Sequence, residues 1–115
     1  MLISMKTFKL VITLRLTTKT NPAYYKGIYV HKIILLPFAP YIDMNLYDID
    51  DVYEIDLLNK NGFSYSIKYK QFDYIDIKIF DYNNERKEYF RGLINAGWLM
   101  GPGYKGQTLI KRIER

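Results

Sequence analysis

The chain has 115 residues, 49% of them hydrophobic, and a formal net charge of +5, so residues 1–115 are expected to form a single domain with a sizeable core. It contains no cysteine, which excludes disulfides, thiolate catalysis and cysteine-based zinc sites and favours a cytoplasmic location. The most apolar run, residues 33–42, is too short to span a bilayer and contains Pro37 and Pro40. We therefore expect no membrane association.

Charge is divided unevenly along the chain. Residues 1–36 carry six basic side chains and no acidic one, residues 37–60 carry six acidic and one basic, and residues 84–115 carry seven basic and three acidic. Such segregation favours a basic face and an acidic edge. The frequent Tyr, Ile, Lys, Asn and Asp residues are typical of an AT-rich genome, which suggests a phage or mobile-element source.

The longest β signal covers residues 6–36. Hydrophobic side chains occupy one parity of its first part, and polar or basic ones mostly occupy the other, which predicts a strand with one buried and one solvated face. The buried set is Phe8, Leu10, Ile12, Leu14 and Leu16, and the solvated set includes Lys9, Thr13 and Arg15. Thr17–Ala23 contains Asn21 and Pro22, which favour a turn. Tyr24–Leu36 is expected to return as an antiparallel strand.

Residues 37–48 form a loop with two prolines and few polar side chains. Its apolar residues Phe38, Tyr41, Ile42 and Leu46 are expected to pack onto the body. Further strands are predicted, in chain order, at Val52–Leu58, Phe63–Lys70, Tyr74–Phe80 and Gln107–Ile113. The turn before Phe63 ends in Gly62, which is expected to supply a positive φ. Within Phe63–Lys70 the alternation of aromatic or aliphatic with polar residues predicts one buried face.

A helix is predicted to begin near Asn84, whose side chain would cap free N–H groups. Gly97 or the run 101–103 is expected to end it, and its apolar arc would cover the sheet. The order of five strands, one helix and one strand predicts an α+β domain, with a mostly antiparallel sheet of about six strands packed by a helix in the C-terminal half. A strongly curled sheet or partial barrel is the alternative.

Three patterns that suggest catalysis or ligand binding are better explained structurally. Residues 101–108 have the spacing of a phosphate-binding loop, but they follow a helix and precede a strand, which is the reverse of the required order, so we interpret them as a connection. The acidic residues between Asp48 and Asp56 are typical of a solvated edge. His31 is the only histidine and has no cysteine or second histidine to share a metal. No cofactor and no metal site are predicted.

One tripeptide resembles a nuclease motif. Asp76-Ile77-Lys78 lies on a predicted strand that precedes a helix and a further strand, which is similar to the arrangement in PD-(D/E)xK nucleases. The resemblance implies that Asp76 binds a metal ion and that Lys78 lies near the attacking water. A second acid would have to come from Asp73 or Asp56. A metal-dependent nuclease is therefore one alternative function.

The main binding signal is the interleaving of basic and aromatic residues. Tyr25, Tyr29 and His31 share one parity of the second strand, and Lys9 and Arg15 share the non-core parity of the first. If these parities coincide, they form one exposed face on which bases stack and phosphates pair. A second group of basic candidates comprises Arg86, Lys87, Arg91 and Lys105.

Together these patterns favour a small non-enzymatic binding or inhibitory protein that acts by macromolecular contact. The expected partner is a host protein or nucleoprotein. Direct binding of single-stranded nucleic acid is the first alternative, and the metal-dependent nuclease is the second. Uncovered sheet edges would also allow a homodimer.

Overall fold

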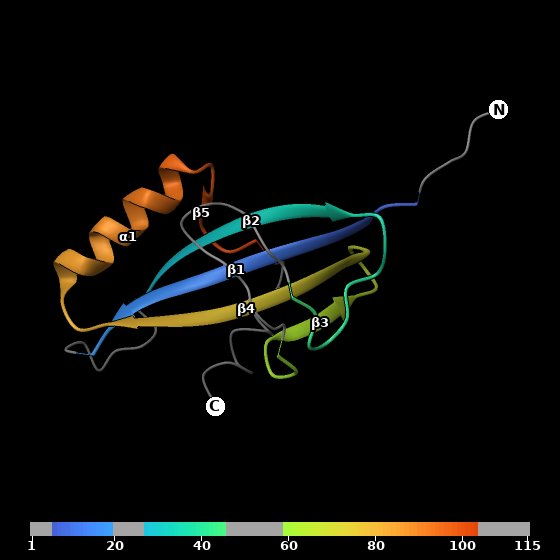
Figure 1. The fold of residues 1–115 in the computed structure, drawn as a ribbon, viewed down its shortest axis with the longest axis horizontal. Helices are drawn as coiled ribbons and strands as arrows, with labels where there is room; N and C mark the ends of the chain where they lie inside the picture. The colour runs from blue at the N-terminus through green and yellow to red at the C-terminus, as the bar shows by residue number, and fades with distance from the viewer. Residues whose placement is uncertain (1–5, 20–26, 46–58, 104–115) are drawn as a thin grey trace.

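The computed structural model describes residues 6–19, 27–45 and 59–103 (Figure 1). The elements in these ranges are β1 (Phe8–Thr18), β2 (Ile28–Leu36), β3 (Phe63–Ser66), β4 (Gln71–Phe80), α1 (Asn83–Asn95) and β5 (Leu99–Met100). The predicted strands Val52–Leu58 and Gln107–Ile113 lie outside the described residues. The sequence pattern does not predict β5, which has only two residues.

The strands form one sheet in the order β3-β4-β1-β2-β5. β1 pairs antiparallel with β2 and parallel with β4, while β3 with β4 and β2 with β5 are antiparallel. The predicted α+β class is confirmed: the sheet is mixed but mostly antiparallel, and one helix follows late in the chain. The described sheet has five strands and is not curled, so the alternative of a partial barrel is wrong.

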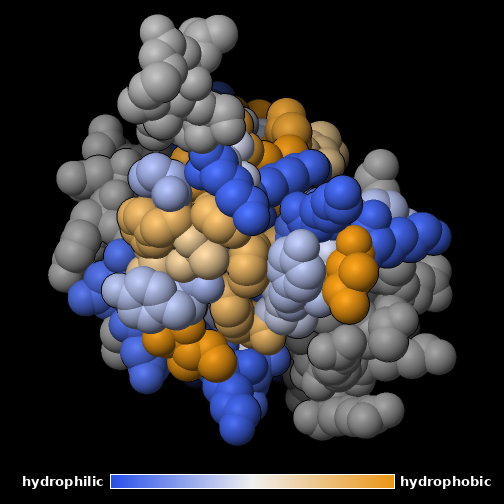
Figure 2. Space-filling model, turned by 90° about the vertical axis from the view of Figure 1, so that its right-hand side faces the viewer, coloured by the Kyte–Doolittle hydropathy of each residue, from blue (hydrophilic) through white to orange (hydrophobic). Residues whose placement is uncertain are grey.

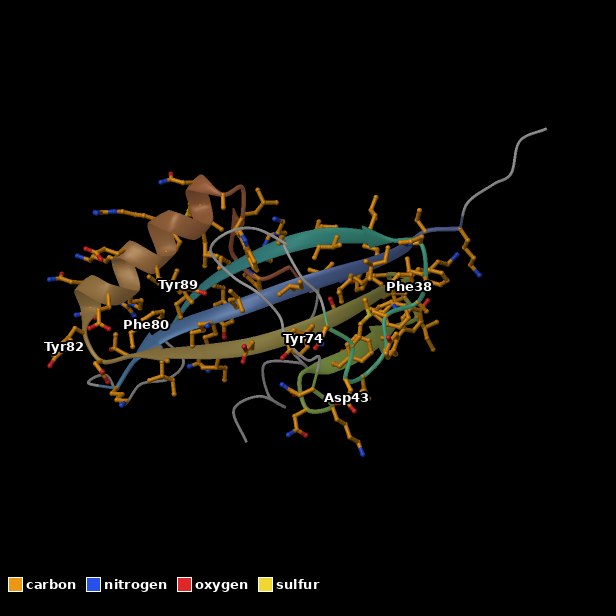
Figure 3. All side chains as sticks on the ribbon, in the orientation of Figure 1. Phe38, Asp43, Tyr74, Phe80, Tyr82 and Tyr89 are labelled. Atoms are coloured by element: carbon orange, nitrogen blue, oxygen red, sulfur yellow. The ribbon has the colours of Figure 1, made fainter. Side chains whose placement is uncertain are left out.

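The core lies on the face of the sheet that α1 covers. The predicted core parity of β1 supplies its centre, with fully buried side chains from Leu10, Ile12, Leu14 and Leu16. Leu93 of α1 and Trp98 just beyond it belong to the same buried cluster. The rings of Phe80 and Tyr89, with centroids 5.3 Å apart, continue this packing toward the start of α1 (Figure 3).

The opposite face of β1 is also buried, so the predicted solvated face is wrong. Its side chains at Val11, Thr13, Arg15 and Thr17 are each only 1 or 2% exposed. Residues 101–103 cross part of this face: the Gly103 N–H donates to Thr13 Oγ1 at 3.2 Å, and His31 Nδ1 donates to the Gly101 carbonyl at 2.8 Å. A period-two pattern shows that two faces differ in chemistry, but it does not show which chain segments cover them.

The glycines of residues 101–103 make this crossing possible. Gly101 has a φ of 90°, a backbone angle that residues other than glycine rarely adopt. A Cβ atom at Gly103 would collide with Val11 Cγ1 and would lie 2.9 Å from His31 Cβ. The described start of the run that resembles a phosphate-binding loop, residues 101–103, therefore lies against the sheet, where Gly103 permits close approach.

α1 begins without the predicted cap. Its first residue is Asn83, and the N-cap residue Tyr82 makes no side-chain capping hydrogen bond. Asn84 therefore lies inside the first turn, and its predicted role as the cap is wrong. Glu85 lies in the same turn, where a negative charge favours the positive end of the helix. No helix in the described residues is long and apolar enough to cross a membrane.

The predicted end of α1 at Gly97 is confirmed. Gly97 has a φ of 102°, its N–H donates to the Ile94 carbonyl at 3.0 Å, and the Trp98 N–H donates to the Leu93 carbonyl at 3.0 Å. This pair of hydrogen bonds is a Schellman motif, which commonly has an apolar contact across it. Trp98 and Leu93, both buried in the core, supply that contact.

The loop after β2 packs through a residue other than those predicted. Phe38, Tyr41 and Ile42 are all more than 40% exposed, at 47, 60 and 42%, so their predicted packing onto the body is wrong. Leu46 lies outside the described residues. Met44 instead enters the core, and its N–H donates to the Tyr41 carbonyl at 3.2 Å. A tight turn therefore directs one side chain of the loop inward and leaves its larger side chains in water.

Gly62 is required for close approach and not, as predicted, for a positive φ. Among the described glycines only Gly97 and Gly101 have a positive φ. A Cβ atom at Gly62 would collide with the carbonyl oxygen of Ile75, whose N–H donates to the Gly62 carbonyl at 2.9 Å. Asn59 Oδ1 also accepts from the Gly62 N–H at 2.9 Å. This turn is therefore fixed directly against β4.

Candidate functional site

The predicted shared face of β1 and β2 exists, but its predicted exposure is wrong. The register places Arg15 opposite Tyr29 and Thr13 opposite His31, so these side chains lie on one face. Arg15 is nevertheless 2% exposed, and a Cβ atom at Gly27 would lie 2.7 Å from Arg15 Cγ. The guanidinium of Arg15 is therefore not presented to solvent, and the half-buried His31 holds the crossing segment through its bond to residue 101.

The other predicted binding residues are not gathered into one surface. Tyr25 and Lys105 lie outside the described residues. Three basic side chains lie on α1, at Arg86, Lys87 and Arg91. Glu85 and Glu88 lie among them, so α1 does not present a purely basic surface. α1 begins at the end of the sheet where β1 and β4 finish, whereas Lys9 lies at the end where β1 begins (Figure 1).

The nuclease-like residues lie on the core side of the sheet. Asp76 pairs with Leu14 and Lys78 with Leu16, and both partners are fully buried. Lys78 Nζ lies 5.4 Å from the centroid of the Tyr89 ring under α1. A cation over an aromatic face is attracted by the ring quadrupole, so this lysine already has a structural partner.

The acids that a nuclease would need are not brought together in the described residues. Asp73 lies on the same strand as Asp76 at an odd spacing, so the two side chains point to opposite faces. Asp56 lies outside the described residues. No group of three or more metal-ligating side chains occurs in the part of the chain that the structure describes. The nuclease alternative therefore gains no geometric support.

A different set of side chains comes together where β1 begins. β2 ends and the β3–β4 turn lies at the same end, so segments distant in sequence meet there (Figure 1). They form a half-open cavity of about 450 Å³, here called the aromatic–lysine pocket, which is lined by Lys6, Thr7, Phe8, Lys9, Tyr65, Lys70 and Phe72. Figure 2 shows this end of the molecule, where an apolar area is bordered by hydrophilic side chains. The volume lies in the range of ligand pockets.

Phe72 is the centre of the aromatic part of the pocket. Its ring stacks on Phe63 with centroids 5.7 Å apart, packs against Tyr65 at 4.6 Å, and meets the edge of Phe8 at 6.4 Å. Phe8, Phe63 and Phe72 are half-buried, but Tyr65 is 50% exposed. The inner rings therefore fix Tyr65 from one side and leave part of it open to solvent.

Two exposed lysines border these rings. Lys6 Nζ lies 5.6 Å from the centroid of Phe8, within the range of a cation–π contact. Lys70 ends the β3–β4 turn with a φ of 51°. Lys9 is only half-exposed, and the described part of the lining contains no carboxylate. The pocket therefore combines aromatic surface with positive charge.

A buried carboxyl group lies near Lys9. Asp73 is 3% exposed, and burial raises its pKa from 3.8 to about 6. A hydrogen bond of 2.7 Å from Gln71 Nε2 and the positive charge of Lys9 partly oppose this rise in pKa. The charge of Lys9 is therefore partly engaged with the interior, whereas Lys6 and Lys70 remain at the surface.

The β3–β4 turn extends the exposed surface beyond the pocket. We call residues Ile67, Lys68, Tyr69 and Lys70 the hairpin tip. Ile67 is 83% exposed, and Lys68 Nζ lies 5.4 Å from the centroid of the Tyr69 ring. β3 ends at Ser66, so the predicted buried face of Phe63–Lys70 does not continue into the tip. Alternation in the sequence continues past the strand, but pairing with β4 stops.

Lys9 is the one described member of the pocket that the sequence predicts as a binding residue. Phe8 is predicted as core and Tyr65 as buried, because each lies on the apolar parity of its strand. The available signal is local: lysines flank aromatic residues within 6–9 and again within 68–72. Only the sheet topology shows that these two segments meet.

Comparison with protein-family models, curated proteins and solved structures finds no significant match to this chain. The aromatic–lysine pocket and the hairpin tip are thus the features from which a function is inferred.

Proposed function

We propose that this protein is a small non-enzymatic binding protein that acts by contacting a macromolecule through the hairpin tip and the aromatic–lysine pocket. The observation that carries the proposal is the exposure of Ile67 and Tyr65, at 83 and 50%, beside Lys6 and Lys70. Large apolar and aromatic side chains grouped at the surface and rimmed by polar groups are typical of interaction sites.

The proposed partner is a host protein or nucleoprotein, and the proposed effect on it is inhibition. The composition, which favours a phage or mobile-element source, supports a partner in the host cell. Positive charge around the pocket supports a partner with an acidic or phosphate-bearing surface, because complementary charge speeds encounter and selects the partner.

The groups in the pocket are of the kinds that hold ligands. The described residues of its lining offer ammonium groups, aromatic rings and the hydroxyls of Thr7 and Tyr65. Ammonium groups pair with anionic groups of a partner, and the rings supply apolar contact area.

The proposal is tested by affinity capture from the source cell with the wild-type chain, Ile67→Ser and Tyr82→Ser. Tyr82 is a matched control, because it is 67% exposed and lies at the other end of the molecule from Phe38 and the hairpin tip (Figure 3). We expect the wild type and Tyr82→Ser to retain the same partner and Ile67→Ser to lose it. Equal capture by all three chains would contradict the proposal.

A further inference from the structure

We infer that the aromatic–lysine pocket binds one nucleotide of a single-stranded nucleic acid, with a base stacked on Tyr65 and the neighbouring phosphates paired with Lys6 and Lys70. This inference rests on the proposed function, because it names the chemistry of the partner at the same site. It differs from the basic face predicted on β1 and β2, whose Arg15 is buried.

Tyr65 is suited to stack a base. Its ring is half-exposed, and its packing against Phe72, with centroids 4.6 Å apart, holds it in place. Phe72 itself also contacts Phe63, so both of these β3 rings pack against it. A ring that is already ordered loses little conformational freedom when a base stacks on it, and single-strand binding proteins use such aromatic platforms.

Lys6 and Lys70 are suited to contact the phosphates. Both are exposed and line the same cavity as Tyr65, and no carboxylate lines it among the residues that the structure describes. Lys9 contributes positive charge from a half-buried position, but part of its charge acts on Asp73. Proteins that bind single strands without strong sequence preference stack the bases on aromatic rings and pair the phosphates with nearby lysines.

The cavity favours an unpaired strand over a duplex. A concave site of about 450 Å³ accepts a base only when the base is free of its own stack. A duplex would offer phosphates to the lysines, but its bases would not reach Tyr65. A preference for single strands over duplexes therefore distinguishes this inference from general electrostatic attraction between a basic protein and a nucleic acid.

The test is fluorescence anisotropy with a labelled oligothymidylate of about ten nucleotides and with the matching duplex, between about 50 and 200 mM salt. The variants are Tyr65→Leu, which keeps an apolar contact with Phe72, and the double variant Lys6→Gln with Lys70→Gln. Lys19→Gln is the matched control, because the Lys19 side chain is 69% exposed and follows the end of β1, at the opposite end of this strand from the pocket. Thermal unfolding of each variant verifies that it folds.

We expect the single strand to bind more tightly than the duplex. Tyr65→Leu should weaken single-strand affinity by about 5- to 150-fold, the effect of losing one base–aromatic stack. The double lysine variant should reduce the slope of log affinity against log salt by about 1.4, since each phosphate contact on a single strand contributes about 0.7. Lys19→Gln should leave both quantities unchanged.

Three results would overturn the inference: no binding at the lowest salt, equal binding of single strand and duplex, or an effect of Lys19→Gln as large as that of the pocket variants. If oligonucleotides fail to bind while Ile67 is still needed to capture a protein, the nucleotide inference is wrong and the proposed function stands. If oligonucleotides fail to bind and Ile67 is not needed to capture a protein, the nucleotide inference and the proposed function are both wrong.

Discussion

At the end of the sheet covered by α1, Lys78 lies over the ring of Tyr89, and Phe80 packs against the same ring (Figure 3). At the other end, Lys6 lies over Phe8, and Tyr65 packs against Phe72. The contacts are chemically alike, but α1 lies over the first group and the second lines a cavity. The difference teaches that coverage by a helix, and not residue type, decides whether lysine and aromatic side chains serve the fold or remain available to a partner.

The largest expected effect is on the covered end. Trp98→Ala should lower the free energy of unfolding by about 3–5 kcal/mol, because it leaves a cavity in the core and removes the apolar contact of the helix end. The matched change is Ile67→Ala at the opposite end of the sheet, here called the open end, where the pocket lies. This change should alter the free energy of unfolding by less than about 0.5 kcal/mol, since the Ile67 side chain is mostly in water. Urea denaturation measures both. A loss from Ile67→Ala comparable to that from Trp98→Ala would remove the distinction between the two ends.

The sequence predicts more of the covered end than of the open end. The core parity of β1, the position of α1 and its stop at Gly97 follow from local signals: period-two alternation, period 3.6 and a glycine after the last turn. The pairing of β1 with β4 is parallel and joins residues about sixty positions apart. No local pattern encodes such a neighbour. The pocket depends on it, because Phe8 meets Phe72 only through this pairing.

Burial is the second feature that the sequence does not show. Thr13 and Arg15 alternate with leucines and are compatible with solvent, yet both are buried, and residues 101–103 cross part of their face. Conversely, Tyr65 has the parity of a core residue but lies on β3, which is a four-residue strand at the edge of the described sheet. An edge position leaves one side without a neighbouring strand, so a side chain of core type can remain half-exposed there.

The next effect concerns the buried acid beneath the pocket. In the unfolded chain Asp73 titrates near 3.8 and in the folded protein near 6, so the folded state binds more protons between these values and stability falls as pH rises through this window. Asp73→Asn, which preserves an acceptor for Gln71, should remove this loss of stability with rising pH. The variant should be more stable than the wild type by up to about 3 kcal/mol at pH 7 and nearly equal to it below pH 4.

Denaturation of both chains across this pH range measures the difference directly, and the contribution of the other acids cancels. A difference between the two chains that does not change with pH would show that Asp73 is not the group that loses a proton in the folded state.

A smaller effect is expected at the turn that precedes β3. Gly62→Ala should cost about 1–3 kcal/mol, because the added methyl group meets the Ile75 carbonyl oxygen and backbone has to shift. Asn61→Ala, at the exposed neighbouring position, should cost less than about 0.5 kcal/mol. Because this turn leads into the strand that carries Tyr65, Gly62→Ala should also weaken nucleotide binding. Destabilisation with unchanged binding would show that the pocket does not depend on how β3 enters the sheet.

The smallest expected effect is at the surface of the covered end. Lys19 Nζ and Asp81 Oδ1 form an ion pair of 3.0 Å, but both side chains are more than half exposed, at 69 and 59%. A double-mutant cycle with Lys19→Gln and Asp81→Asn should give a coupling energy of about 0.2–1 kcal/mol that falls with added salt. A larger and salt-independent coupling would mean that even exposed charges help to hold the covered end together. The two ends would then differ in how their charges are fixed as well as in how their rings are covered.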